Sequence, residues 1–102
     1  MTRKRPDRTA RRADERAARK LVRDRERLAG LERGGSAARP IEVGTAAVIE
    51  VRTGAMKCPQ CGGSYDLGEH RAEHGLRVVA VTCRVCHVSR QIWWRIVPAG
   101  PN

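Results

Sequence analysis

The fold of this chain is decided by two short stretches, Cys58-Pro59-Gln60-Cys61 and Cys83-Arg84-Val85-Cys86, with 21 residues between the inner cysteines. Two residues between the cysteines of a pair allow both sulfurs to reach one ion. Four thiolates in two C-x-x-C pairs form the ligand set of a closed tetrahedral zinc site. We therefore expect one structural Zn2+ bound by Cys58, Cys61, Cys83 and Cys86.

The size of the chain explains why a metal is needed. The 102 residues allow one domain with a tail, and phenylalanine is absent. The folded part is expected to be shorter than the whole chain. Below about 70–80 residues a hydrophobic core rarely suffices, and a metal or disulfides must add stability. Disulfides suit secreted proteins, but the first residues are charged and contain no apolar segment typical of a signal peptide. The sequence also lacks an apolar run of about 20 residues that could span a membrane. We expect a cytoplasmic protein with metal-bound thiolates.

The charge of the chain is concentrated in its first part. Residues 1–39 contain 14 of the 21 Lys and Arg residues and 6 of the 11 Asp and Glu residues. Residues 40–102 are close to neutral once a zinc ion with four thiolates is included. The basic field therefore belongs to an N-terminal arm, which we place at residues 1–33.

The arm is expected to be helical over residues 7–31. Alanine and leucine recur at three-, four- and seven-residue steps, Asp7 is a candidate N-cap, and Gly30 or Gly34-Gly35 would end the helix. Three interpretations stay open: a solvated or disordered charged tail, a weak coiled-coil seam, and a phosphate-binding segment. In the third, the phosphates are neutralised by arginines of the arm: Arg11, Arg12, Arg16, Arg19, Arg23 and Arg27.

The metal-binding module is expected at residues 41–97, between a flexible linker at 34–40 and a frayed tail at 98–102. Strand patterns occur at 41–43, at 47–52, from Tyr65 onward, at 76–82 and at 88–97, with a turn at His74-Gly75. In the last of these, alternation places Ile92, Trp94 and Ile96 on one face. Trp93 falls on the other face, where it either stacks on a nucleobase or covers the sheet against residues 41–52.

The stretch from 56 to 97 resembles the zinc ribbon class, because Cys-Pro-x-Cys-Gly is followed by a hairpin, a second C-x-x-C and a closing strand. The second pair departs from the doubled pattern, since His87 stands where a glycine would follow Cys86. The resemblance implies a small metal-stabilised β domain, a zinc ribbon of three, four or five short antiparallel strands, preceded here by the basic α-helix. Proteins of this class occur in transcription, in ribosomes and as inserts in enzymes, so it does not define a function.

We expect a non-enzymatic protein that binds DNA or RNA without sequence preference through its arm. The alternative is a protein-interaction adaptor that docks on a larger, acidic partner. A third possibility is a rubredoxin-like iron electron carrier, because iron also accepts four thiolates. His70-Arg71-Ala72-Glu73-His74 matches a zinc-peptidase motif, but Gly68 and Gly75 leave too little helix to present it. No membrane contact and no small-molecule substrate are expected.

Overall fold

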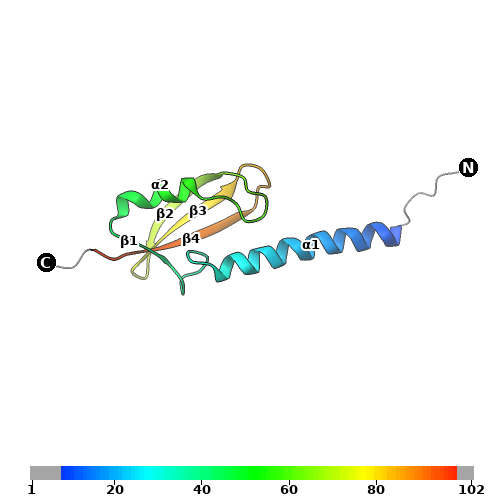
Figure 1. Cartoon of the computed structure of the whole chain (residues 1–102), viewed down its shortest axis with the longest axis horizontal. Helices are drawn as coiled ribbons and strands as arrows, with labels where there is room; N and C mark the ends of the chain where they lie inside the picture. Colours follow the sequence, from blue (N-terminus) through cyan, green and yellow to red (C-terminus); the bar gives the residue numbers. More distant parts are fainter. Residues whose placement is uncertain (1–7, 99–102) are drawn as a thin grey trace, which may run out of the picture.

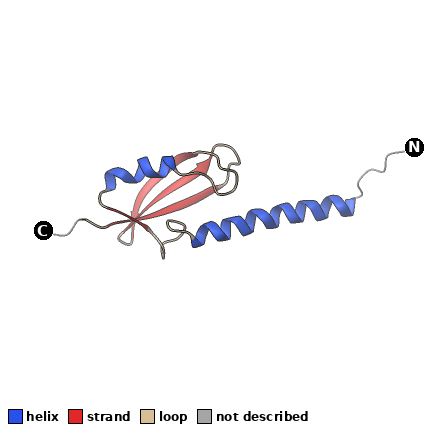
Figure 2. Cartoon of the chain, in the orientation of Figure 1, coloured by secondary structure: helices blue, strands red, loops and turns tan. Residues whose placement is uncertain are grey.

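The computed structural model describes residues 8–98, which form one sheet with a long N-terminal helix (Figures 1 and 2). The elements in chain order are α1 (Arg8–Leu31), β1 (Ile41–Val43), the 3-10 helix η1 (Ala46–Val48), α2 (Ile49–Ala55), β2 (Tyr65–Glu73), β3 (Leu76–Cys83) and β4 (Ser89–Ile96). The arrangement is compatible with a small metal-stabilised β domain. None of the helices in the described part of the chain is long and apolar enough to cross a bilayer.

The sheet has the strand order β1-β4-β3-β2. Strands β2, β3 and β4 form the expected antiparallel meander, with the β2–β3 turn at His74-Gly75 as predicted. Both residues of this turn have positive φ. The expectation of a wholly antiparallel sheet is wrong, however, because β1 pairs parallel with β4, with Ile41 opposite Trp94. A parallel pair needs a long crossover connection, and here α2, β2 and β3 provide it.

The strand expected at residues 47–52 is also wrong, because these residues belong to η1 and α2. The prediction relied on alternation of Ile49 and Val51, but only Ile49 is buried, whereas Val51 is 75 % exposed. The buried pair is Ile49 and Thr53, which are four residues apart on one helical face. The Thr53 hydroxyl donates a hydrogen bond to the Ile49 carbonyl at 2.7 Å, so its polar group is satisfied within the helix.

The core lies on one face of the sheet, beneath α2. Ile92 and Trp94 are buried there together with Val79 and Val81, and Ile96 packs at the edge of the cluster. This confirms the predicted face of β4. Helix α2 covers this same face, since the Arg52 guanidinium lies 5.3 Å from the centre of the Trp94 ring. Trp93 is therefore not covered by residues 41–52.

Helix α1 extends away from the sheet along the longest dimension of the molecule (Figure 1). It corresponds to the helix expected at 7–31, and the proposed cap Asp7 lies outside the described residues, as do most of the expected tail residues. Residues 34–40, expected as a linker, form turns with defined contacts. The Gly34 amide donates to the Arg39 carbonyl at 2.6 Å, and the Gly34 carbonyl accepts from the Trp93 amide at 2.8 Å. The end of α1 is thus attached to β4.

Replacing Ile49 and Val51 separately by alanine tests the helical assignment of α2. We expect Ile49→Ala to lower the free energy of unfolding by about 2–5 kcal/mol, because it leaves a cavity in the core. Val51→Ala should change it by less than about 0.5 kcal/mol. Denaturant unfolding of the metal-loaded protein measures both values. Similar large losses for the two variants would instead support a strand with both side chains in the core.

Candidate metal centre

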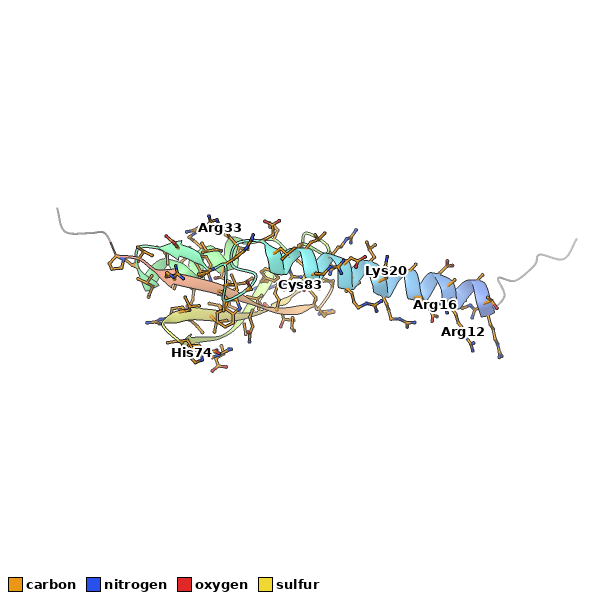
Figure 3. The ribbon with its side chains drawn as sticks, turned by 90° about the horizontal axis from the view of Figure 1, so that it is seen from below. Arg12, Arg16, Lys20, Arg33, His74 and Cys83 are labelled. Atoms are coloured by element: carbon orange, nitrogen blue, oxygen red, sulfur yellow. The ribbon has the colours of Figure 1, made fainter. Side chains whose placement is uncertain are left out.

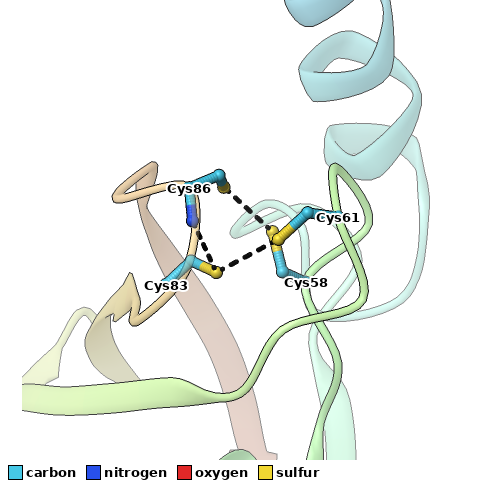
Figure 4. Close-up of side chains that lie close together, drawn as sticks. All are labelled: Cys58, Cys61, Cys83 and Cys86. Carbon is cyan, nitrogen blue, oxygen red and sulfur yellow. Dashed lines mark hydrogen bonds between the residues drawn. The ribbon is translucent and has the colours of Figure 1, made fainter.

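The four cysteines form one compact cluster at the end of the sheet (Figure 4). Their sulfur atoms all lie within 4.8 Å of one another. The shortest separations join the two pairs, at 3.4 Å between Cys61 and Cys83 and at 3.7 Å between Cys58 and Cys86. A tetrahedral ion with metal–sulfur bonds of about 2.3 Å requires sulfur–sulfur separations of about 3.8 Å. The cluster could therefore hold one metal ion.

Disulfide bonding is not the arrangement present. A disulfide needs sulfur atoms about 2.05 Å apart, and all four cysteines are free. Each of the shortest sulfur separations also joins a buried cysteine (Cys58 or Cys83) to an exposed one. The polypeptide thus supplies two ligands from the interior and closes the site with two from the surface.

The two cysteine loops have the same backbone hydrogen bonds. In the first loop the Gly62 amide donates to the Cys58 carbonyl at 2.7 Å, and the Cys58 amide donates to the Gly63 carbonyl at 2.9 Å. In the second loop His87 and Val88 occupy the equivalent places, with distances of 3.1 Å to the Cys83 carbonyl and 2.9 Å from the Cys83 amide. The loops are therefore two copies of one turn that face each other across the sulfur cluster.

The residue after each pair adopts the left-handed backbone conformation. Gly62 has φ of 76° and His87 has φ of 63°. Glycine takes this conformation without steric cost, whereas other residues lose about 1–2 kcal/mol. The second loop thus keeps the geometry of the first although its sequence lacks the glycine.

The charges of the sulfur atoms show why a cation suits this cluster. The amides of Cys86 and Val85 point at the Cys83 sulfur, at 3.5 and 3.3 Å, and lower the pKa of that thiol to about 6. The Val88 amide favours a thiolate at Cys86, but the desolvation of its sulfur by the adjacent loop and the neighbouring sulfurs outweigh this effect and raise the pKa of Cys86 to about 12. One thiolate is favoured, and a fourth is opposed by the others unless a cation offsets their charge.

Gly63 allows the first loop to approach the second closely. A Cβ atom at this position would lie 2.9 Å from the Cys83 sulfur and 2.8 Å from a Val85 methyl group. Glycine at this position lets the backbone of the first loop lie close to the Cys83 sulfur. A side chain at this position would separate the two loops.

The two histidines of the peptidase motif, His70 and His74, lie away from this centre. His70 and Glu73 are on strand β2 rather than on a helix, and His74 is in the turn that follows. The His70 Nδ1 atom lies 3.1 Å from a Glu50 carboxylate oxygen of α2. In residues 8–98, the cysteine cluster is the only group of three or more His, Cys, Asp or Glu side chains placed to hold a metal ion. The peptidase motif therefore has no structural counterpart.

The six arginines predicted to neutralise phosphates are all on α1 and all exposed. Helical periodicity places five of them along one face, at steps of four, three, four and four residues. We call this set the arginine stripe: Arg12, Arg16, Arg19, Arg23 and Arg27. Arg11 lies beside it, and Figure 3 shows Arg12 and Arg16 on the distal part of the helix, beyond the sheet. Within the described residues, Arg27 is the only one of these six in an ion pair, with Asp24 at 3.2 Å.

Sequence reasoning missed the contact that holds α1 against the first cysteine loop. Gln60, between Cys58 and Cys61, donates from its side chain to the Val22 carbonyl at 2.8 Å and to the Glu26 carboxylate at 2.7 Å. Its own carbonyl accepts from the Arg25 guanidinium at 3.1 Å. Glu26 also pairs with Arg90 of β4, which lies 5.9 Å from the centre of the Tyr65 ring. We call residues 22–30 of α1 the docked segment.

Comparison with protein-family models, with curated proteins and with solved structures finds no match for this chain. The fold and the cysteine cluster therefore define the protein only as a small domain with a mixed sheet, a projecting basic helix and a site able to hold a metal ion.

Exchanging the residues after the two cysteine pairs tests the left-handed positions. We expect Gly62→Ala to destabilise the metal-loaded protein by about 1 kcal/mol, because an added Cβ meets no atom within 4 Å and only the backbone conformation is penalised. His87→Gly should be neutral or stabilising by up to about 1 kcal/mol. Thermal unfolding compares the variants. A destabilising His87→Gly would show that the imidazole, rather than the backbone, matters at this position.

The docked segment predicts coupled losses of stability. Gln60→Ala and Glu26→Gln should each cost about 1 kcal/mol, and the double variant less than the sum, because the first removes the hydrogen bond to Glu26 and the second removes the carboxylate charge that strengthens this bond. Denaturant unfolding of the four proteins gives the coupling. Glu42→Gln is the matched control, since Glu42 makes only an exposed ion pair with Arg95. Strict additivity would contradict the contact.

Proposed function

We propose that this protein is a zinc-ribbon-like, non-enzymatic binding protein that uses the arginine stripe of α1 to bind nucleic acid without sequence preference. The observation that carries the proposal is the placement of the stripe. Five arginines lie along one face of a helix whose far half extends from the domain, while its near half is attached to the first cysteine loop.

Zinc is the metal we propose for the cysteine cluster. Tetrahedral sites with four thiolates select zinc or iron, and a closed site with four protein ligands leaves no position for substrate. When bound, the ion supplies the positive charge that offsets four thiolates. The protein supplies the geometry of the site. The amides of Val85 and Cys86 orient the Cys83 sulfur, and Gly63 allows the two loops to approach each other. The role of the ion is structural.

The geometry of the stripe suits a row of phosphates. Arg12 and Arg27 are about 22 Å apart along the helix axis at 1.5 Å per residue, and duplex DNA presents about one charge every 1.7 Å of its axis. Arginine contacts to phosphate supply affinity but little sequence choice. We infer that the folded domain fixes one end of α1 and that the preformed helix then contacts the phosphate backbone of the nucleic acid.

A second candidate function rests on another face of the same helix. Leu21, Leu28 and Leu31 are 49 %, 60 % and 58 % exposed and fall on one face by helical periodicity. We name this set the leucine face. It supports a protein-interaction adaptor, in which an apolar groove of the partner accepts the helix. The two candidates use separate faces, so substitutions on one face leave the other intact.

Substituting three arginines of the stripe tests the first candidate. We expect Arg16→Gln/Arg19→Gln/Arg23→Gln to weaken binding to a labelled 20-base-pair DNA and to reduce the slope of log K against log salt by about 3, one for each phosphate that is no longer neutralised. Glutamine keeps a long side chain and a good helix propensity.

The matched control is Leu21→Ala/Leu28→Ala, which should leave both the DNA affinity and the salt slope unchanged. An unchanged slope for the arginine variant would contradict nucleic-acid binding by the stripe. Absence of DNA binding by the unsubstituted chain at low salt would favour the adaptor.

A further inference from the structure

A cavity of about 420 Å3 lies where α1 meets the sheet. Its walls come from the end of the docked segment, from residues 33–35, from the chain just before and within the first cysteine loop, and from β4. This volume falls in the range of about 300–1,000 Å3 that small-molecule sites occupy. None of the four cysteines and none of the five arginines of the stripe is among the residues that line it.

The apolar part of the wall suits a flat ring. Met56, Tyr65, Ile92 and Trp93 line the cavity, and Trp93 is half-buried while its neighbour Trp94 is 1 % exposed on the opposite face of β4. Aromatic side chains with one accessible side are the platforms on which unpaired bases stack. Trp93 therefore supplies the contact that a planar ligand requires.

The polar part of the wall contains an unused donor. Arg90 lines the cavity, and its Nε atom is buried with no hydrogen-bond partner among residues 8–98. Its terminal nitrogen pairs with Glu26, which also lines the cavity. A buried donor without a partner is uncommon in native structures. The Nε atom has almost no accessible surface, so the Arg90 guanidinium closes the inner wall of the cavity and does not reach a ligand through this atom.

The charged residues at the cavity favour a ligand attached to phosphates. Arg33 and Lys57 are exposed residues that line it, together with Glu32. Glu26 forms an ion pair with Arg90, so their charges offset each other. The other charged side chains that line the cavity, Arg33, Lys57 and Glu32, carry a net positive charge. The cavity also continues the arginine stripe, because Gly30 follows Arg23 and Arg27 on the same helical face and lines the cavity.

We propose that this cavity receives one unpaired base of a single-stranded nucleic acid whose phosphates lie on the arginine stripe. The inference rests on the proposed function and adds a preference for single strands. A duplex presents the same phosphates but keeps its bases paired and stacked, so it reaches only the stripe. The base contacts Trp93, and its flanking phosphates lie near Arg33 and Lys57.

The test uses the full, metal-loaded chain and a deoxythymidine 12-mer, with the uridine 12-mer and a 12-base-pair duplex of mixed sequence alongside. Trp93→Ala should weaken binding of both single strands by roughly 5- to 150-fold, the range for removal of one stacked base, and leave duplex affinity unchanged. Trp93→Phe retains a ring and should weaken binding much less. Single strands should quench tryptophan fluorescence in the wild type, and the quenching should disappear in Trp93→Phe, where buried Trp94 remains.

Three outcomes are possible. Quenching that depends on Trp93, with the weakening confined to single strands, supports the cavity as a base site. Binding of every nucleic acid without quenching, unaffected by Trp93→Ala, overturns the base site and leaves the arginine stripe as the interface. Absence of binding to any of the three probes at low salt overturns the proposed function and the base site with it.

Discussion

Mutual repulsion among four sulfur atoms held within 4.8 Å is the constraint on which the rest of the structure depends. Strand pairing creates this crowding, because Tyr65 of β2 lies opposite Cys83 of β3 and brings the two cysteine loops to the same end of the sheet. The raised pKa of Cys86 records the cost of adding negative charge there. A cation removes that cost, and its binding energy becomes part of the folding energy of a domain with a small core.

The first cysteine loop also determines where the arm points. Gln60 lies between Cys58 and Cys61, and its side chain and carbonyl contact three residues of α1. Glu26 connects the same helix to Arg90, and Arg90 lies against Tyr65 beside the cluster. The metal centre, the docked segment and the cavity at Trp93 are therefore one connected region. These contacts fix the C-terminal part of α1 on the domain, and they thereby set the direction in which the helix and its arginine stripe extend.

The parts of this structure that follow from local pattern were predictable, and the parts that depend on distant contacts were not. Cysteine spacing located the cluster, β-branched composition located β3, and alternation located the face of β4 that carries the buried Trp94. Residues 47–52 satisfy two periodicities, since Ile49 can pair with Val51 as a strand or with Thr53 as a helix, and packing against the sheet selects the second. The parallel edge strand and the Glu26–Arg90 pair join residues more than 50 positions apart, for which a single sequence carries no signal.

The central claim is that one metal ion holds the sheet and the arm together. Amide hydrogen exchange of the zinc-loaded and chelator-treated protein tests it directly, read separately for Val78–Val81 in β3, for the docked segment at 22–30 and for the distal part of α1 at 11–19. The account predicts that metal removal abolishes protection in β3 and in the docked segment together, while the distal part changes little. Protection that persists in the docked segment after β3 has lost its own would contradict the claim, because the arm would then be stable without the metal centre.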